Sequence, residues 1–483
     1  MQQQPETFVP AATGHDSEPP EALVAFMLAG WEPRVEPVAP LEGVERYRAR
    51  REALSRLFPN DELVIPSGHE KVRSNDTNYR FRPGTDYYYL TGNVEPDCVL
   101  VMSAREGGNH EAVTFVEPNL GKSDKTFFTD RAKGELWVGA RLGVAASAHR
   151  YGITARALPE LTGTVETLAQ GARAVRVLRG IDAALDAAIP PFVEGDAALA
   201  ASLSEMRLIK DAYEIGELER AVAATKRSFD DVLRALPQST SERTVEGVFA
   251  LRARVEGNDV GYGTIAACGA HACTLHWTRN DGCVAPGDLL LLDAGVETDT
   301  LYTADVTRTV PVSGRFSSEQ REVYELVLAA QEAALERCRP GEDFLAPNDA
   351  AMRVLASGLE RFGILPSASE ALDPEKQFYK RYSLHNVSHM LGLDVHDCAH
   401  ARKETYKYGK LAAGMALTVE PGLYFQPDDA TVPPRYRGIG VRIEDDVVIT
   451  NDGYRSLTAG FPRQVAAVEA WVSECAKAGP RLP

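Results

Sequence analysis

Two nine-residue stretches, GDLLLLDAG at 287–295 and GMALTVEPG at 414–422, have the same plan. Asp293 follows the opening glycine of the first stretch by six residues, and Glu420 does the same in the second. Each acid ends an almost wholly apolar run, which is typical of a strand buried on both faces. The two stretches therefore predict equivalent buried strands, each with a carboxylate at its end.

A second pair of acids extends the match beyond these strands. Asp305 precedes Gly314 by nine residues, and Glu444 precedes Gly453 by the same number. Two coincidences in one register indicate an internal duplication. We therefore expect a fold with pseudo-two-fold symmetry that brings four carboxylates together.

The segments before these strands fit the same duplication. Apolar residues from Ile215 to Leu236 recur at steps of three and four, which predicts one face of a helix. A second helix is expected at 241–256. In the other half, the capping pattern Ser-Ser-Glu-Gln from Ser317 predicts a helix start, and a further helix is expected at 347–362. Each half is thus predicted as two helices followed by strands.

The chain before this duplication has a different pattern. Residues 41–195 mix helical and strand-like runs, which favours an α/β domain, with a helix at 44–58. Strands are expected at ELVIP (62–66), YYYLTG (87–92), CVLVM (98–102) and AVTFV (112–116). Residues 1–40, rich in Pro, Glu and Gln, are predicted to be a disordered extension with room for a short helix at 22–31. The duplicated domain is assigned to 196–483.

The bulk composition excludes several classes of partner. The 483-residue chain has a formal net charge of −17, whereas nucleic acids and anionic membranes require a basic face. No apolar run approaches the length of a membrane span, and the N-terminus lacks the features of a secretory signal. Seven scattered cysteines without a C-x-x-C pair are typical of free thiols in a reducing compartment. We expect a cytoplasmic protein that binds neither nucleic acid nor membrane.

The four acids need a cation if they meet in the core. Each acid alone is more often a turn, cap or surface residue, but a buried carboxylate without a partner is very costly. HNVSHMLGLDVHD at 385–397 offers three histidines, and Asn386 occupies the place where a zinc helix H-E-x-x-H requires Glu. Carboxylates with one imidazole suit two divalent ions, Mn²⁺, Co²⁺ or Zn²⁺, which can activate a water and polarise a carbonyl.

Two further residues are expected to line this site. In GVRIEDDVVIT at 440–450, the alternation of a strand places Arg442 on the same face as Glu444. His276 lies 17 residues before Asp293 and leads into its strand. We therefore regard Arg442 and His276 as candidate walls of the cavity.

At these residues the sequence resembles the pita-bread metallopeptidases, which include Xaa-Pro aminopeptidases (aminopeptidase P), prolidases and methionine aminopeptidases. The resemblance covers about residues 40–475 and rests on LHW, LLDAG, ADVTRTVPVSG, SHMLGLDVHD, TVEPGLY and RGIGVRIEDDVVIT. It implies that Asp305 and Glu444 bridge two metal ions and that Glu420 is also the general base. The five implied metal ligands are Asp293, Asp305, His389, Glu420 and Glu444.

The resemblance also implies two sets of substrate contacts. Tyr262 would line the pocket of the leaving residue, and His276 and His396 would hydrogen-bond the substrate or the tetrahedral intermediate. The pocket on the proline side would be bordered by His385, Tyr424 and Arg442.

The first domain limits the resemblance to those members of the family that have an additional N-terminal domain. RSNDTNYRFRPGTDYYYLTGNVEPDCVLVM at 73–102 resembles the N-terminal domain of aminopeptidase P and prolidase, which methionine aminopeptidases lack. The implied function is metal-dependent hydrolysis of the N-terminal Xaa-Pro bond of peptides with proline in second position, by a homodimer or homotetramer, with Mn²⁺ as the preferred metal. A prolidase acting on Xaa-Pro dipeptides, a catalytically silent binding protein of this fold, and a metal-independent amidinohydrolase of the creatinase type are the alternatives.

Two features depart from the family pattern. The spacing from Asp293 to Asp305 is one residue longer than usual, and we place the extra residue in the turn at 298–300. A register shift instead would turn Asp305 away from the metals. The other departure is His271, which stands where relatives often carry Asn.

Overall fold

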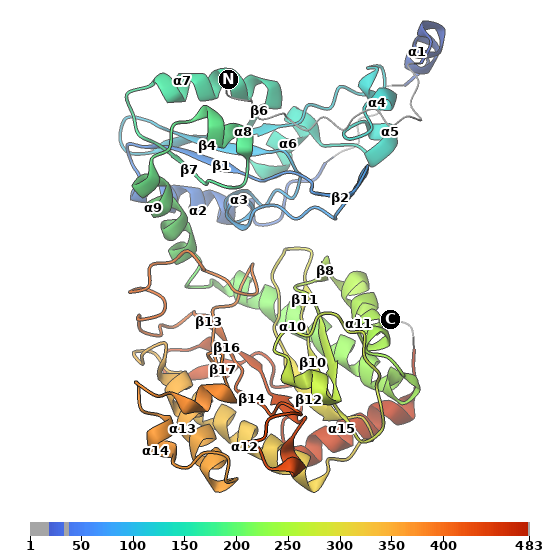
Figure 1. Ribbon diagram of the computed structural model, residues 1–483. Coiled ribbons are helices and arrows are strands. Elements are labelled where there is room, and N and C mark those ends of the chain that lie inside the picture. The colour runs from blue at the N-terminus through green and yellow to red at the C-terminus, as the bar shows by residue number, and fades with distance from the viewer. Residues whose placement is uncertain (1–18, 33–37, 482–483) are drawn as a thin grey trace, which may run out of the picture. The chain divides into compact units, whose positions relative to one another are not determined.

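The chain forms two compact units, residues 1–203 and 204–483, in the computed structural model (Figure 1). The structure describes residues 19–32 and 38–481. The boundary expected after residue 195 falls within helix α9 (Val193–Met206).

Most of the predicted N-terminal extension lies outside the described residues. Within its described part, helix α1 (Glu21–Leu28) forms at the place where a short helix was expected. Over 19–32 and 38–481, no helix combines the length and the apolar character that crossing a bilayer requires.

The first unit is built on a mixed five-stranded sheet in the order β6-β5-β4-β1-β7. Helices α7 and α8 cover one face of this sheet, and α2 and α3 lie on the other (Figure 1). Its strands are β1 (Glu62–Pro66), β4 (Val99–Ala104), β5 (His110–Val116), β6 (Thr154–Ala157) and β7 (Val175–Val177), with a separate hairpin of β2 (Val72–Ser74) and β3 (Thr77–Asn78). Its helices after α1 are α2 (Val44–Leu57), α3 (Thr85–Thr91), α4 (Thr126–Thr129), α5 (Glu135–Val138), α6 (Gly143–Tyr151), α7 (Leu161–Gln170) and α8 (Ala183–Ala188).

The strand predicted for YYYLTG is wrong, because this segment is the helix α3. Its tyrosines are buried in succession rather than alternately, so the core surrounds the segment instead of facing one side. The end of the helix is fixed by Gly92, which has a φ of 69°. Arg50 and Arg51 of α2 donate to the carbonyls of Tyr89 and Leu90 in the last turn. Tertiary contacts therefore outweigh the strand preference of aromatic residues.

The second unit repeats one plan twice, as the sequence predicts. The first half contains, in order, α10 (Ala212–Ala235), α11 (Glu242–Glu256), β8 (Asp259–Val260), β9 (Ile265–Cys268), β10 (Leu289–Asp293), β11 (Val296–Glu297) and β12 (Thr307–Pro311). The second half contains α12 (Ser318–Leu335), α13 (Ala346–Arg361), α14 (Ala368–Ala371), β13 (Ala416–Val419), β14 (Gly422–Tyr424), β15 (Gly440–Arg442), β16 (Asp445–Ile449) and β17 (Tyr454–Ser456), and α15 (Val465–Ala478) follows it.

Local signals in the sequence explain where the helices of this unit begin. Asp211 forms a capping box with Glu214 at the start of α10, and Ser317 forms the predicted one with Gln320 at the start of α12. The apolar face predicted for α10 packs into the core, with Phe229 almost fully buried. These helices cover the outside of the paired strands (Figure 1).

The strands of each half form a bent antiparallel hairpin. In the first half β10 pairs with β12 and β9, and in the second half β13 pairs with β16, which also pairs with β17. All side chains of β10 and β13 are buried. The two acid-bearing strand ends therefore lie in the interior of the unit.

Candidate active site

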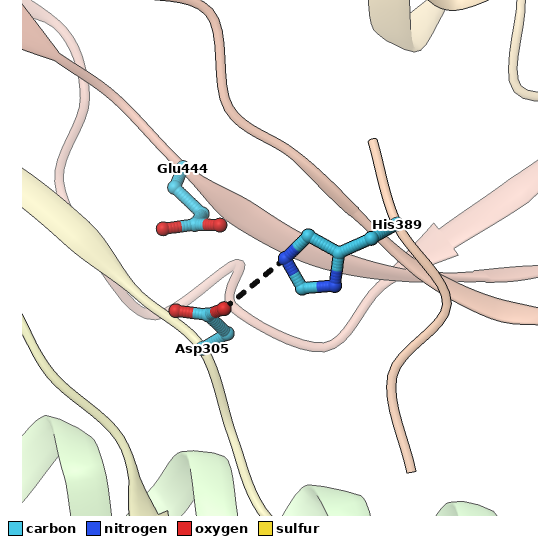
Figure 2. A group of neighbouring side chains, drawn as sticks. All are labelled: Asp305, His389 and Glu444. Atoms are coloured by element: carbon cyan, nitrogen blue, oxygen red, sulfur yellow. Dashed lines mark ion pairs between the residues drawn. The ribbon is translucent and has the colours of Figure 1, made fainter. Parts of the chain in front are cut away.

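Asp305, His389 and Glu444 come together from three separate parts of the chain (Figure 2). Their ligand atoms all lie within 4.8 Å of one another, and Nε2 of His389 is 3.3 Å from Oδ2 of Asp305. The structure thus brings together three of the residues that the sequence predicted as metal ligands. Carboxylate and imidazole donors at this spacing suit a divalent cation.

The hairpins and one irregular segment hold these three side chains. Asp305 lies just before β12, and Glu444 immediately precedes β16. His389 lies outside regular structure but is bound to β13, because its carbonyl accepts from the Thr418 N–H at 3.0 Å and its N–H donates to the Thr418 hydroxyl at 3.2 Å. Backbone pairing therefore fixes where the imidazole enters the site.

Asp293 and Glu420, the acids of the repeated strands, reach the same cluster. Glu420 Oε1 is 3.7 Å from Nε2 of His389. The hydroxyl of Tyr262 is 2.7 Å from Oδ1 of Asp293 and also hydrogen-bonds to Asp305. All five residues predicted as ligands consequently lie in one group.

Burial and mutual proximity shift the pKa values of these groups. Burial, with Asp305 and Asp293 adding to it, raises the pKa of Glu420 to about 8. Burial also raises the pKa of Glu444 well above its usual value. Burial alone would lower the pKa of His389, but Asp305 and Glu420 outweigh it and raise the pKa to about 9. Acids that disfavour one another's ionisation in this way are stabilised when a cation neutralises them.

Arg442 supplies one positive charge to the cluster. Its guanidinium, only 3% exposed, forms an ion pair with Asp293. It also donates to the Tyr424 hydroxyl at 3.0 Å and to the Thr307 hydroxyl at 3.2 Å, and Thr307 donates to Glu444 at 2.7 Å. Arg442 and Glu444 therefore meet at the same hydroxyl and lie on one face, as the strand alternation predicted.

His385, Tyr424 and Arg442 form a hydrogen-bonded chain along one side of the site. Nδ1 of His385 is 2.9 Å from the Asn386 carbonyl, which can only accept, so this nitrogen carries the proton. Nε2 then accepts from the Tyr424 hydroxyl at 2.7 Å. Burial and the charge of Arg442 lower the pKa of His385 to about 4, so the ring is neutral. The three residues predicted to border the proline pocket are thus adjacent.

His276 and His396 present exposed imidazoles beside the buried cluster. The His396 ring meets the His389 ring edge-on, with 4.4 Å between their centroids. Partial loss of hydration and the neighbouring His389 lower the pKa of His396. Both exposed rings are accessible to a bound ligand.

Tyr262 was predicted to line the pocket of the leaving residue, and its hydroxyl is turned toward Asp293 and Asp305. Burial raises the pKa of Tyr262 well above its usual value, so the phenol stays a donor. A donor on two candidate ligands fixes their orientation. The structure therefore adds a supporting contact to the predicted role.

Two polar residues of the site, Asp446 and Thr307, were not predicted from the sequence. The fully buried Asp446 accepts from the Asp305 N–H at 3.1 Å, and its other oxygen has no hydrogen-bond partner among the described residues. The strand alternation that placed Arg442 beside Glu444 would also have placed Asp446 on that face. The same alternation, counted from Asp305, would have placed Thr307, which joins Arg442 to Glu444, on the face of Asp305.

His271, the second departure from the family pattern, contacts Glu242 and Trp277, the residue that follows His276. Its Nδ1 is 2.8 Å from the buried carboxylate of Glu242, and its ring stacks on Trp277 with 3.9 Å between centroids. The Trp277 indole donates to the other oxygen of Glu242 at 2.8 Å. The histidine at position 271 therefore packs against Trp277, which follows His276 in the sequence.

The longer spacing between Asp293 and Asp305 does not turn Asp305 away from the site. A tight turn carries the chain from Thr298 to Leu301, where φ is 66° and the Leu301 N–H donates to the Thr298 carbonyl at 2.9 Å. Gly295 and Ala304 lie on the two segments that this turn connects. A Cβ at Gly295 would lie 1.6 Å from the Ala304 carbonyl oxygen, so only glycine allows this close approach.

Comparisons with known proteins agree with this geometry. A family model for the aminopeptidase P N-terminal domain matches residues 47–177, and one for metallopeptidase family M24 matches residues 216–451. Xaa-Pro aminopeptidase 1 of Streptomyces coelicolor is 51% identical over 458 residues, which cover 94% of this chain and 92% of that protein. The chain belongs to the Xaa-Pro aminopeptidases of metallopeptidase family M24.

Members of this family from other bacteria are also similar. The Xaa-Pro aminopeptidase of Escherichia coli is 34% identical and covers 88% of this chain and 97% of its own length. A solved structure of E. coli aminopeptidase P with the inhibitor Pro-Leu has a TM-score of 0.81 at 32% identity, covering 90% of this chain and 100% of that chain. The predicted resemblance and the predicted pita-bread fold with an aminopeptidase P-like first domain are confirmed.

Proposed function

We propose that this M24 peptidase hydrolyses the first peptide bond of peptides with proline in second position and releases the N-terminal residue. The observation that carries the proposal is a cluster of three buried carboxylates, the partly buried Glu420 and His389, next to the chain of His385, Tyr424 and Arg442. The curated relatives that share most of this chain bear the same activity in their names.

The donors in the cluster fit a pair of divalent ions. Four carboxylates with one imidazole form a hard site, and burial and mutual repulsion raise the pKa values of Glu420 and Glu444, which a bound cation would relieve. When bound, two divalent ions activate a water and polarise the scissile carbonyl. We propose Mn²⁺ as the native metal, with Co²⁺ or Zn²⁺ as substitutes; one solved structure of the E. coli relative is described as zinc-substituted with product. The proposed ligands are Asp293, Asp305, His389, Glu420 and Glu444.

The remaining groups would handle the substrate. Glu420 would take the proton of the attacking water, and His276 and His396 would donate hydrogen bonds to the oxygen that becomes negative. Tyr262 would orient Asp293 and Asp305. The proline side would be bordered by His385, Tyr424 and Arg442.

Proline explains why a separate peptidase is needed for this bond. The Xaa-Pro bond is a tertiary amide without an N–H, and the ring fixes φ, so a substrate cannot bind in the usual extended manner. A closed pocket for the ring avoids that requirement. The acidic cluster would also attract the free α-amino group and favour cleavage at the N-terminus.

Assembly and location stay proposals. We propose a homodimer or homotetramer in the cytoplasm, acting on peptides and not on nucleic acid or membranes. The net charge of −17 supports the last part, because it would repel polyanions.

Substrate length tests the proposed specificity. A tripeptide Xaa-Pro-Yaa and the dipeptide Xaa-Pro are compared after chelation of metal and again after addition of Mn²⁺, and the released amino acid is measured. We expect Mn²⁺ to restore cleavage of the tripeptide at the Xaa-Pro bond. Cleavage of the dipeptide alone would show a prolidase, and no cleavage of either would favour a silent binding protein.

A further inference from the structure

A buried charge network lies beneath the loop that carries His396. This loop, residues 391–398, has no helix or strand, and its His396 side chain is exposed. The next residue, Asp397, points the other way and is almost fully buried, with a side-chain exposure of 1%. An irregular loop needs such an anchor to hold one geometry, because it has no ladder of backbone hydrogen bonds.

Two cations from a single segment grip Asp397. Nε of Arg207 donates to Oδ1 of Asp397 at 3.0 Å, and Nζ of Lys210 donates to Oδ2 at 3.1 Å. The side chains of Arg207 and Lys210 are only 4% and 1% exposed. The N–H of Cys398 also donates to Oδ1, at 2.8 Å. Both carboxylate oxygens are therefore held, which fixes the rotation of the loop one residue from His396.

The same segment is tied to the other side of the site. Glu214 is buried, interacts electrostatically with Lys210, and accepts from the hydroxyl of Tyr302 at 2.8 Å, three residues before Asp305. The N–H of Thr303 donates to the carbonyl of Gly392 at 3.0 Å, so the two loops are also bonded directly. Two cations and two carboxylates thus form a buried network that contacts both loops.

Stability alone does not account for this network. Charged groups lose their hydration when they are buried, and apolar side chains of the same volume often stabilise a core equally well. Burial would raise the pKa of Asp397, but Lys210 and Arg207 outweigh it and lower the pKa, so the carboxylate stays charged. The charges add directional hydrogen bonds to Asp397, and these bonds fix the backbone next to His396, whose side chain needs a defined orientation.

We infer that Arg207 and Lys210 are positioning residues for the hydrolysis, acting through Asp397 to aim His396 at the substrate. The inference rests on the proposed function of His396. It adds two residues that do not touch the substrate and that lie 190 and 187 positions before Asp397 in the sequence.

The substitution Lys210→Met tests the inference, because it removes the charge and leaves the pair of Arg207 and Asp397. In the full-length, Mn²⁺-loaded protein, we expect kcat for the tripeptide to fall about 10- to 100-fold while KM and Mn²⁺ content stay near those of the wild type. In a His396→Ala background, Lys210→Met should lower kcat by less than about 2-fold, since coupled residues are not additive. If Lys210→Met does not fold, Arg207→Lys, which keeps the charge, is combined with His396→Ala and the same kcat comparison is made.

A second ion pair, which also links the segment before α10 to the segment that follows the His396 loop, provides a matched control. Glu205 and Arg402 form an ion pair at the protein surface, and Arg402→Gln should change kcat by less than about 2-fold because exposed pairs contribute little. Equal losses of kcat in the wild-type and His396→Ala backgrounds would overturn the inference. Loss of Mn²⁺ from Lys210→Met would also overturn it, because the network would then act on the metal site.

Amide hydrogen exchange of residues 391–398 tests the inference without turnover. We expect faster exchange in Lys210→Met and no change in Arg402→Gln. An unchanged rate in Lys210→Met would refute the positioning role even for an active enzyme. Absence of tripeptide cleavage by the wild type, in contrast, would refute the proposed function and leave the exchange result to decide whether the network holds the loop.

Discussion

Glu420→Gln is expected to lower kcat for an Xaa-Pro-Yaa tripeptide by roughly 10²- to 10⁴-fold, the usual contribution of a general base. Glutamine keeps the shape of the side chain, but its amide cannot take the proton of the attacking water. The amide is also a weaker ligand than a carboxylate, so metal content should fall. Steady-state kinetics at saturating Mn²⁺, with metal content measured on the same samples, checks both effects.

An exposed acid provides the control for this substitution. Glu404 lies at the surface in the segment before β13, and Glu404→Gln removes the same charge outside the cluster. We expect it to leave kcat and metal content unchanged. Wild-type kcat in Glu420→Gln would show that another group takes the proton, and the role assigned to Glu420 would be withdrawn.

Arg442→Met should produce the largest loss of stability among single changes at the site. It leaves Asp293 buried without its cationic partner and leaves Tyr424 and Thr307 without their donor. Breaking a buried ion pair in this way lowers the free energy of unfolding by about 3–5 kcal/mol. Urea unfolding of the metal-free protein measures this loss. Lysine at position 442 should not restore it, because one ammonium cannot replace a guanidinium that bonds in three directions.

Arg455 is the matched control, since its ion pair with Glu219 lies at the surface. Arg455→Met is expected to lower the free energy of unfolding by less than about 1 kcal/mol. If the two substitutions had equal effects, Arg442 would not be the internal counter-ion of the cluster.

The duplication of the second domain could be predicted because its signal is local. Apolar strands that end in Asp293 and Glu420 repeat one spacing, and the capping box at Ser317 marks a helix start without any tertiary contact. The segment YYYLTG could not be predicted in this way. Its strand-like composition is outweighed by burial on all sides and by donors from Arg50 and Arg51, which lie 39 residues before the carbonyls they bind.

In the candidate site, too, the features that are encoded locally in the sequence could be predicted and the others could not. The alternation along one strand predicted that Arg442 and Glu444 share a face, and the resemblance supplied the histidines and tyrosines. The residues that surround the predicted site residues could not be predicted from sequence spacing. Asp397 meets Arg207 from 190 residues away, and Glu242 meets Trp277 from 35 residues away, so only the folded chain shows what holds these neighbours of His396 and His276.

Five protein groups are proposed to hold the divalent ions on which hydrolysis depends. The decisive measurement is a titration of the metal-free protein with Mn²⁺, with bound metal and tripeptide hydrolysis measured on the same samples at several pH values. Because His389 and Glu420 have pKa values of about 9 and 8 without metal, both hold protons at neutral pH and must release them to bind an ion. Raising the pH through this range should therefore strengthen Mn²⁺ binding. We expect two ions per chain and hydrolysis that rises with bound metal, whereas full hydrolysis by the metal-free protein would show that the five groups do not act through metal.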